Sequence, residues 1–112
     1  SSSLIIGPDE DRLPDSVDLA EIRNAIRSGQ KLEVDYQDGH GSSTLRTVWP
    51  FAVGYFNRAR VMVAWCELRE GFRHFRTDRI RSLTQTGRRY PKHRLALLKA
   101  WSEQEGISIR LD

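Results

Sequence analysis

Short runs of alternating apolar and polar residues, separated by turn sequences, fill the middle of the chain. The first run, residues 31–36 (KLEVDY), places an apolar residue at every second position, which predicts a half-buried β-strand. Turn sequences follow at residues 38–39, 57–59 and 70–71. Because tight turns of this kind join antiparallel strands, the pattern restricts the fold to a small, mainly β domain with a strongly bent sheet or a barrel.

The later runs predict further strands, giving five or six in all. Residues 44–56 carry apolar side chains at most odd positions, but Pro50 cannot donate a hydrogen bond within a sheet and predicts a division into two strands. Residues 61–66 (VMVAWC) are apolar on both faces, as in a central strand that is covered on both sides. Residues 72–77 and 79–84 predict two more strands, and their imperfect alternation indicates bulges.

Helices are predicted on both sides of these strands. The first lies between Asp18, whose carboxylate can cap it, and Gly29, which can end it. The second has Pro91 at a first helical position and ends before Gly106. Its apolar face is predicted from residues at helical spacing, Leu95, Leu98 and Trp101. A short strand is expected over residues 107–111.

Length and composition indicate one soluble domain. A chain of 112 residues with 38% hydrophobic and 29% charged residues can bury a core, which excludes a disordered chain. Residues 1–17 hold glycine, proline and an acidic run and predict a linker, which leaves residues 18–112 as the folded domain. No apolar run approaches the roughly 18 residues of a membrane helix, and no signal peptide is recognisable. We therefore expect a cytoplasmic protein without membrane partners, and the missing initiator Met suggests a piece of a longer chain.

Charge is distributed unevenly along the sequence. Residues 1–38 have a net charge of −5, whereas residues 39–94 hold 12 basic and three acidic residues, a net charge of +9. All but three of the 18 basic residues are arginines, the side chain best suited to forked contacts with phosphate or carboxylate. The pattern favours an anionic partner. The alternative, that these arginines only solvate the surface, stays open for any single one.

Catalytic and metal-binding patterns are weak. The three histidines, His40, His74 and His93, lack metal-ligand spacing, and the lone Cys66 lies in the most apolar run. The carboxylates form no fixed pair, and no glycine-rich phosphate loop is present. We therefore predict a protein that is not an enzyme, with no cofactor and no metal, and a buried, inert Cys66.

Residues 70–83 (EGFRHFRTDRIRSL) concentrate arginine in two predicted strands. If these strands are neighbours, their arginines can line one groove: Arg73, Arg76, Arg79 and Arg81. Nearby aromatic residues could stack on nucleic-acid bases while the arginines hold phosphates. These aromatic residues are Tyr55, Trp65, Phe72 and Phe75. The alternative is a role in the core, which is favoured for Phe75 and Ile80 and left open for Tyr55 and His74.

Residues 64–80 (AWCELREGFRHFRTDRI) resemble the WYL domain of bacterial transcription regulators of the YafY type. The resemblance extends over about residues 18–85, since the helix before LEVDY, the LRTVWP run and the RTDRI run follow in the family's order. It implies an Sm-like, SH3-type five-stranded barrel with an N-terminal and a C-terminal helix. It also implies a basic groove for a ligand or nucleic acid, formed by Arg46, Arg73, Arg76 and Arg79, with His74 as a further lining residue.

The sequence departs from this family where its name-giving Trp-Tyr-Leu is expected. The chain has Arg60-Val61-Met62 there, so a ligand contact through that tyrosine cannot be carried over.

The resemblance implies an effector-binding sensor domain. The expected effector is anionic, such as single-stranded DNA or a nucleotide, and its binding would control an N-terminal helix-turn-helix domain that contacts promoter DNA and lies outside this chain. The alternative is a protein interaction module that forms a homodimer, in which Leu95, Leu98 and Trp101 supply the apolar surface.

Overall fold

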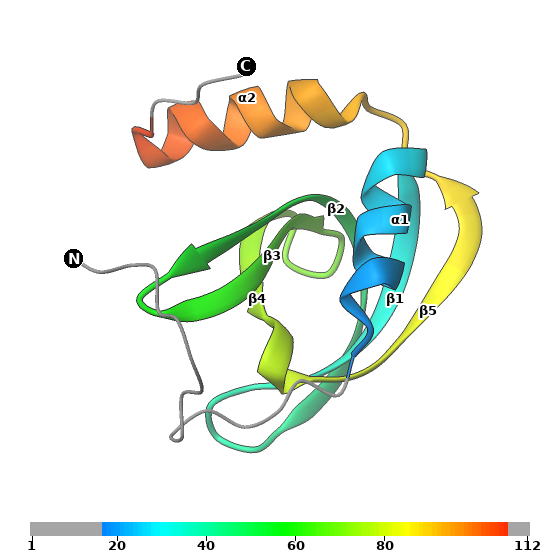
Figure 1. Cartoon of the computed structure of the whole chain (residues 1–112), viewed down its shortest axis with the longest axis vertical. Coiled ribbons are helices and arrows are strands. Elements are labelled where there is room, and N and C mark those ends of the chain that lie inside the picture. The colour runs from blue at the N-terminus through cyan, green and yellow to red at the C-terminus, as the bar shows by residue number, and fades with distance from the viewer. Residues whose placement is uncertain (1–16, 108–112) are drawn as a thin grey trace.

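The computed structural model describes residues 17–107, which form five strands and two helices. The elements are α1 (Leu19–Ser28), β1 (Gln30–Gln37), β2 (Ser43–Phe56), β3 (Ala59–Cys66), β4 (Gly71–Arg76), the 3-10 turn η1 (Thr77–Arg79), β5 (Ile80–Arg89) and α2 (Arg94–Glu105). The strands form one antiparallel sheet in the order β4-β3-β2-β1-β5 (Figure 1). Most of the predicted linker and of the strand expected at residues 107–111 lies outside the described residues, so the boundary at residue 18 stays a prediction.

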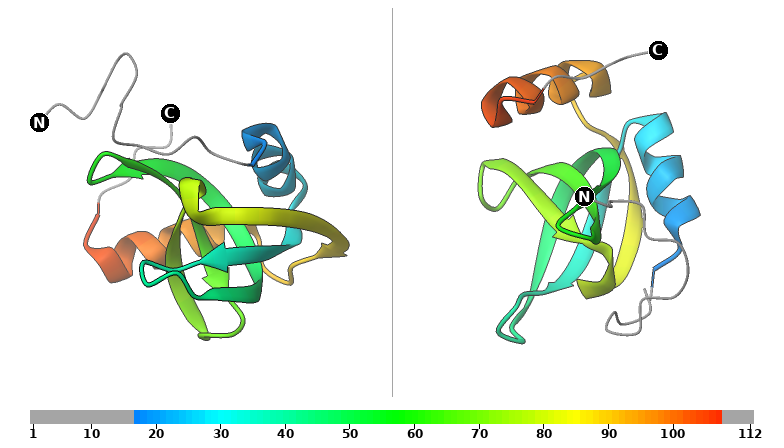
Figure 2. Two further views of the ribbon diagram at one scale, coloured as in Figure 1. Left: turned by 90° about the horizontal axis from the view of Figure 1, so that it is seen from below. Right: turned by 60° about the vertical axis from the view of Figure 1, so that its left-hand side comes forward.

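The mainly β fold class is confirmed, but the expected closed barrel is not. The sheet curls strongly (Figure 2), yet β4 and β5 lie at its two opposite edges and do not pair with each other. The chain passes from one edge to the other through η1, where the sequence predicted a second strand to begin at Arg79. The assumption that the arginine-rich strands are neighbours in the sheet is therefore wrong.

β2 is one continuous strand, so the predicted division at Pro50 is also wrong. Its first half pairs with β1 as far as Val48 and its second half pairs with β3 from Val48 onward. Pro50 follows the last pair with β1, so its missing N–H removes no bond from that ladder. Phe51 is an extra residue between two pairs of the β2–β3 ladder, a bulge that bends the strand. The Pro50 carbonyl accepts a hydrogen bond from the Tyr90 hydroxyl at 2.8 Å, and burial raises the pKa of that tyrosine.

The concave face of the sheet and α1 enclose the larger of two apolar clusters. All five strands contribute to it from their inward positions, and α1 adds the face that carries Ile22 and Ile26. Cys66, Phe75 and Ile80 belong to this cluster and are almost completely buried, as predicted. The predicted inward face of early β2 is wrong: Leu45 is exposed, and Arg46 and Val48 point inward instead.

The α1 boundaries follow the sequence prediction. Asp18 caps the helix by accepting a hydrogen bond from the Ala20 N–H at 2.9 Å, and Gly29 ends it with a positive φ of 66°.

In the described part of the chain, no helix is long and apolar enough to span a membrane.

α2 packs on the convex face of the sheet through a second apolar cluster. Leu97 and Trp101 are buried there against Phe51, whereas Leu95 is exposed and Leu98 is half-buried. The predicted apolar face is therefore confirmed for Leu98 and Trp101 and wrong for Leu95, and Leu97 also belongs to it. The start was also misplaced: His93 is the N-cap and α2 begins at Arg94, three residues after Pro91. Its end before Gly106 is as predicted.

Glu67, in the turn after β3, contacts Lys31 of β1 and Trp49 of β2. Its Oε2 accepts a hydrogen bond from Trp49 Nε1 at 2.8 Å and lies 2.7 Å from Lys31 Nζ. The hydrogen bond from Lys31, and next that from Trp49, lower the pKa of Glu67 from its ordinary value of 4.5. A carboxylate with a lowered pKa stabilises the fold above its unfolded-state pKa, and this stabilisation disappears as the pH falls through the folded-state pKa.

We expect Glu67→Gln to reduce the free energy of unfolding at pH 7 by less than about 1 kcal/mol, because the carboxylate is partly exposed. Urea unfolding at pH 7 and at pH 3 measures the effect. The difference between the variant and the original chain should be smaller at pH 3, because the stabilisation by the ionised carboxylate decreases once the pH falls below the ordinary pKa of 4.5. An equal loss at both pH values would show that the charge of Glu67 does not stabilise the fold.

Candidate ligand-binding site

Three arginines surround a cavity of about 370 Å³ where the β1–β2 turn meets the end of β4. Arg76 ends β4, Arg79 ends η1, and Arg81 lies near the start of β5. Residues of β1 and of the β1–β2 turn form the rest of the lining: Gln37, Asp38, Gly39 and Gly41, together with Asp78 of η1. We call this the arginine cavity. The cavity forms where η1 connects the two edge strands, β4 and β5, which lie near each other there but do not pair.

Arg76 is already engaged inside the protein. Its Nε and Nη2 donate to the two carboxylate oxygens of Asp78 at 3.0 and 2.7 Å. The hydrogen bond to Asp78 raises the pKa of Arg76, which therefore stays charged. The backbone N–H of Arg76 donates to the Tyr36 hydroxyl at 3.0 Å, which fixes the end of β4 against β1.

Arg79 and Arg81 are the arginines best placed to bind a ligand. The Arg79 guanidinium lies over the β1–β2 turn, and its Nη1 is 3.7 Å from where a Cβ on Gly39 would lie. Arg81 is exposed and donates through Nη2 to the carbonyl of Asp78 at 3.3 Å. Asp38 accepts hydrogen bonds from the N–H groups of His40 and Ser42, which lower its pKa and keep it ionised. The cavity thus combines three positive and two negative side chains.

The predicted groove is only partly assembled. Arg76 and Arg79 meet in the arginine cavity, but Arg46 and Arg73 do not line it. Arg46 is buried beside the contacting rings of Tyr36 and Phe75, with its guanidinium carbon 6.0 and 5.8 Å from their centres. Arg73 is exposed on β4 and pairs with Ala64 of β3.

His74 is exposed on β4 and lies beside Trp101 of α2. Its ring stacks on Phe56 with centres 4.8 Å apart, and its Nε2 accepts a hydrogen bond from Trp101 Nε1 at 3.1 Å. The alternation of β4 separates His74 from Phe75, which points into the concave cluster. The structure therefore gives His74 a packing role and does not place it in the arginine cavity.

The aromatic residues considered for base stacking also lie elsewhere. Trp65 and Phe72 pack against each other with ring centres 5.3 Å apart, and Phe72 also contacts Phe51. Tyr55 is exposed near the β2–β3 turn. None of the four candidate aromatic residues lines the arginine cavity.

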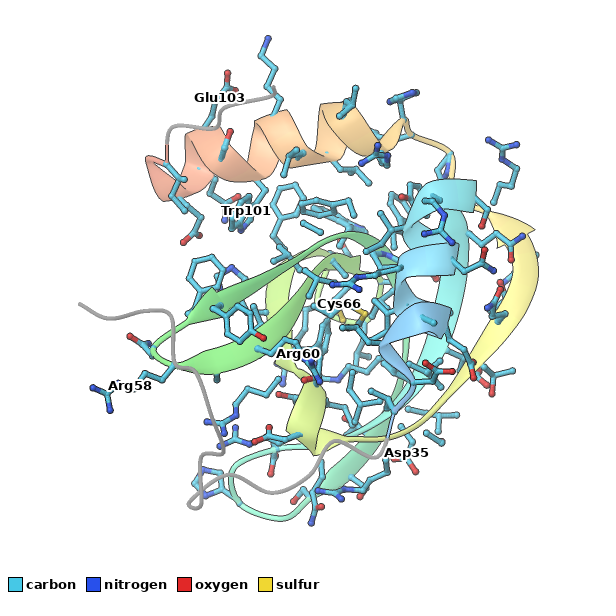
Figure 3. The ribbon with its side chains drawn as sticks, viewed as in Figure 1. Asp35, Arg58, Arg60, Cys66, Trp101 and Glu103 are labelled. Carbon is cyan, nitrogen blue, oxygen red and sulfur yellow. The ribbon has the colours of Figure 1, made fainter. Side chains whose placement is uncertain are left out.

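Arg60, at the first position of the departure from Trp-Tyr-Leu, has a structural role (Figure 3). Its Nε donates to Thr77 Oγ1 at 3.3 Å, and that hydroxyl donates to the Arg60 carbonyl at 3.4 Å. These bonds join β3 to η1 and so help to position the neighbouring Asp78 and Arg79.

The site predicted from the sequence lacks Arg81 and the β1–β2 turn, both of which line the arginine cavity. Arg81 belonged to the arginine-rich segment, and that segment was the available signal. The turn could not be identified in the same way, because it approaches η1 only through the curl of the sheet. Within residues 17–107, no group of three or more potential metal ligands lies together.

Comparison with known proteins decides the family. The WYL domain matches residues 18–85, more than half of the chain. The chain belongs to the WYL domain family. A solved structure of proteasome accessory factor B/C (PafBC) of Arthrobacter aurescens is similar, with a TM-score of 0.62 and 32% sequence identity over 70% of this chain. The matched part makes up 12% of that longer chain. No curated protein sequence matches this chain.

Proposed function

We propose that this WYL domain is the effector-binding sensor domain of a bacterial transcription regulator, and that the arginine cavity binds the phosphates of single-stranded DNA or of a nucleotide. Membership of the family and the similarity to PafBC support a regulatory domain. The proposed ligand rests on one observation: Arg76, Arg79 and Arg81 line the same cavity. Arginine binds phosphate through two parallel hydrogen bonds, which suits this arrangement.

Ligand binding would control a helix-turn-helix domain outside this chain by favouring one of its orientations. Such control requires that the ligand bind two conformations with different affinity. The η1 segment is suited to this role because it carries Arg79 and connects the two edges of the unclosed sheet. A phosphate held by Arg79 and Arg81 would draw η1 and β5 toward the β1–β2 turn.

A homodimer through the apolar face of α2 has less support. Trp101, the largest residue of the predicted surface, is only 6% exposed because it packs on the domain's own sheet. Leu95 is the one residue of the predicted trio that remains exposed. A single leucine provides far less than the apolar area of a stable dimer interface.

We expect an Arg79→Ala, Arg81→Ala variant to bind a labelled 12-residue oligothymidylate at least about tenfold more weakly than the original chain, because each charge-assisted phosphate contact contributes roughly 1.5 to 3 kcal/mol. Fluorescence anisotropy at several salt concentrations measures this. The slope of log affinity against log salt should decrease by about 1.4, since each lost phosphate contact on a single strand removes about 0.7. The isosteric Asp78→Asn should have the opposite effect, because it releases Arg76 from its carboxylate.

The matched control is an Arg58→Ala, Arg69→Ala variant, which removes the same charge. Arg58 lies at the β2–β3 turn and points away from the domain (Figure 3), and Arg69 is exposed in the turn after β3. We expect this variant to bind the oligonucleotide nearly as well as the original chain. Equal weakening in both double variants would show that net charge, and not the arginine cavity, binds the oligonucleotide.

A further inference from the structure

A second basic region lies where the end of α1, the end of β5 and the start of α2 meet (Figure 1). Two adjoining cavities of about 90 and 370 Å³ occur there, and they share Ile26, Arg27 and Arg94 in their linings. We call this region the helix-junction pocket. The arginine cavity shares no lining residue with it.

The lining of the helix-junction pocket contains basic side chains and no carboxylate that would neutralise them. Five permanently charged side chains come from α1, β5, the β5–α2 connection and α2: Arg23, Arg27, Arg89, Lys92 and Arg94. Within residues 17–107, no aspartate or glutamate lines either cavity. This differs from the arginine cavity, where Asp78 holds Arg76 and Asp38 adds a second negative charge. An anion in the helix-junction pocket would therefore meet less competition from the protein's own carboxylates.

The larger cavity also has an apolar floor. Its apolar lining residues are Phe51, Ala52 and Val53 of β2, Leu98 of α2 and Ile26 of α1; among them Ala52, Val53 and Leu98 are partly exposed, whereas Phe51 and Ile26 are buried. The cavity of about 370 Å³ is wide open to solvent, so a bound ligand would keep part of its surface exposed. A nucleic-acid backbone would use the arginines but leave this floor uncovered.

We propose that the helix-junction pocket is a second ligand site, which takes a small anion with an apolar body, such as an aromatic phosphate or carboxylate. The anionic group contacts Arg27 and Arg94, which line both cavities, and the apolar body covers the partly exposed Ala52, Val53 and Leu98. Because α1 and α2 each pack on β2 from different sides of the pocket, the ligand links the two helices. This site is separate from the proposed effector site and does not depend on it.

Titration of the ¹⁵N-labelled chain with 1-naphthyl phosphate tests the proposal, with inorganic phosphate and 1-naphthol as separate probes. Amide signals of residues 23–29, 51–53 and 92–98 should shift, and 1-naphthyl phosphate should bind at least about tenfold more tightly than either fragment. An Arg27→Gln, Arg94→Gln variant should weaken its binding by about tenfold. Both arginines are exposed, so the variant should keep the spectrum of a folded chain.

The matched control is Arg58→Gln, Arg69→Gln, which removes equal charge at the β2–β3 turn and at the turn after β3, outside both sites, and should leave binding of 1-naphthyl phosphate unchanged. Three results would overturn the proposal: no binding of 1-naphthyl phosphate, equally tight binding of 1-naphthol, or shifts confined to residues 37–41 and 76–81. Equal weakening in the two double variants would also overturn it, because binding would then depend only on net charge.

Discussion

Phe75→Ala is expected to lower the free energy of unfolding by about 3–5 kcal/mol, a large part of the 5–15 kcal/mol typical of a domain. Phe75 is 1% exposed, and its ring meets that of Tyr36 edge to face with centres 5.0 Å apart. This contact joins β4, at one edge of the sheet, to β1 near the other edge. Because β4 and β5 do not pair, packing through Phe75 has to maintain the curl that backbone hydrogen bonds maintain in a closed barrel.

Urea unfolding followed by circular dichroism measures this loss, and Phe75→Leu is the matched control. Leucine retains most of the buried volume but lacks the ring contacts with Tyr36 and Arg46, so we expect less than half of the alanine effect. The arginine cavity should also bind oligothymidylate more weakly in Phe75→Ala, since Arg76 follows directly in the chain and its N–H is fixed by Tyr36. A loss below about 1 kcal/mol in Phe75→Ala would show that the two edges are held together elsewhere.

The sequence contained enough local information to predict most strands but not how they meet. Asp18 and Gly29 gave the ends of α1 because capping depends on neighbouring residues. Pro50 misled the prediction because its effect depends on which neighbouring strand it meets: β1 pairs only as far as Val48, whereas β3 pairs with Pro50 through Ala64. Arg46 was placed in the groove through the family resemblance, which does not show that its guanidinium packs against Tyr36 of β1 and Phe75 of β4.

The candidate site was less predictable for the same reason. Counting charge along the sequence identified the segment that carries Arg76, Arg79 and Arg81, but not which side chains meet. That depends on η1 and on the bidentate pairing between Arg76 and Asp78. The helix-junction pocket left no recognisable signal at all, because its arginines come from positions as distant as Arg23 and Arg94 and meet only when both helices pack on β2.

Trp101→Ala is expected to detach α2 from the sheet, with a loss of about 3–5 kcal/mol in its packing. Trp101 points from α2 toward the sheet (Figure 3) and lies edge to face with Phe51 and Phe56, with centres 6.2 and 6.1 Å apart. A helix of 12 residues is marginal in water without such packing. Hydrogen exchange should therefore accelerate in α2 while the amides of β1 and β3 stay protected.

Trp101→Phe separates packing from hydrogen bonding. Phenylalanine keeps the ring in the cluster but cannot donate to His74 Nε2, so we expect a loss of about 1 kcal/mol and an α2 that remains protected. Detachment of α2 also removes Arg94 and Leu98 from the helix-junction pocket, so Trp101→Ala should abolish binding of 1-naphthyl phosphate without altering a single residue of that pocket. Oligothymidylate binding should persist, because α2 contributes nothing to the arginine cavity. Loss of both activities in Trp101→Ala would mean that α2 stabilises the whole sheet, and the two sites would then not be independent.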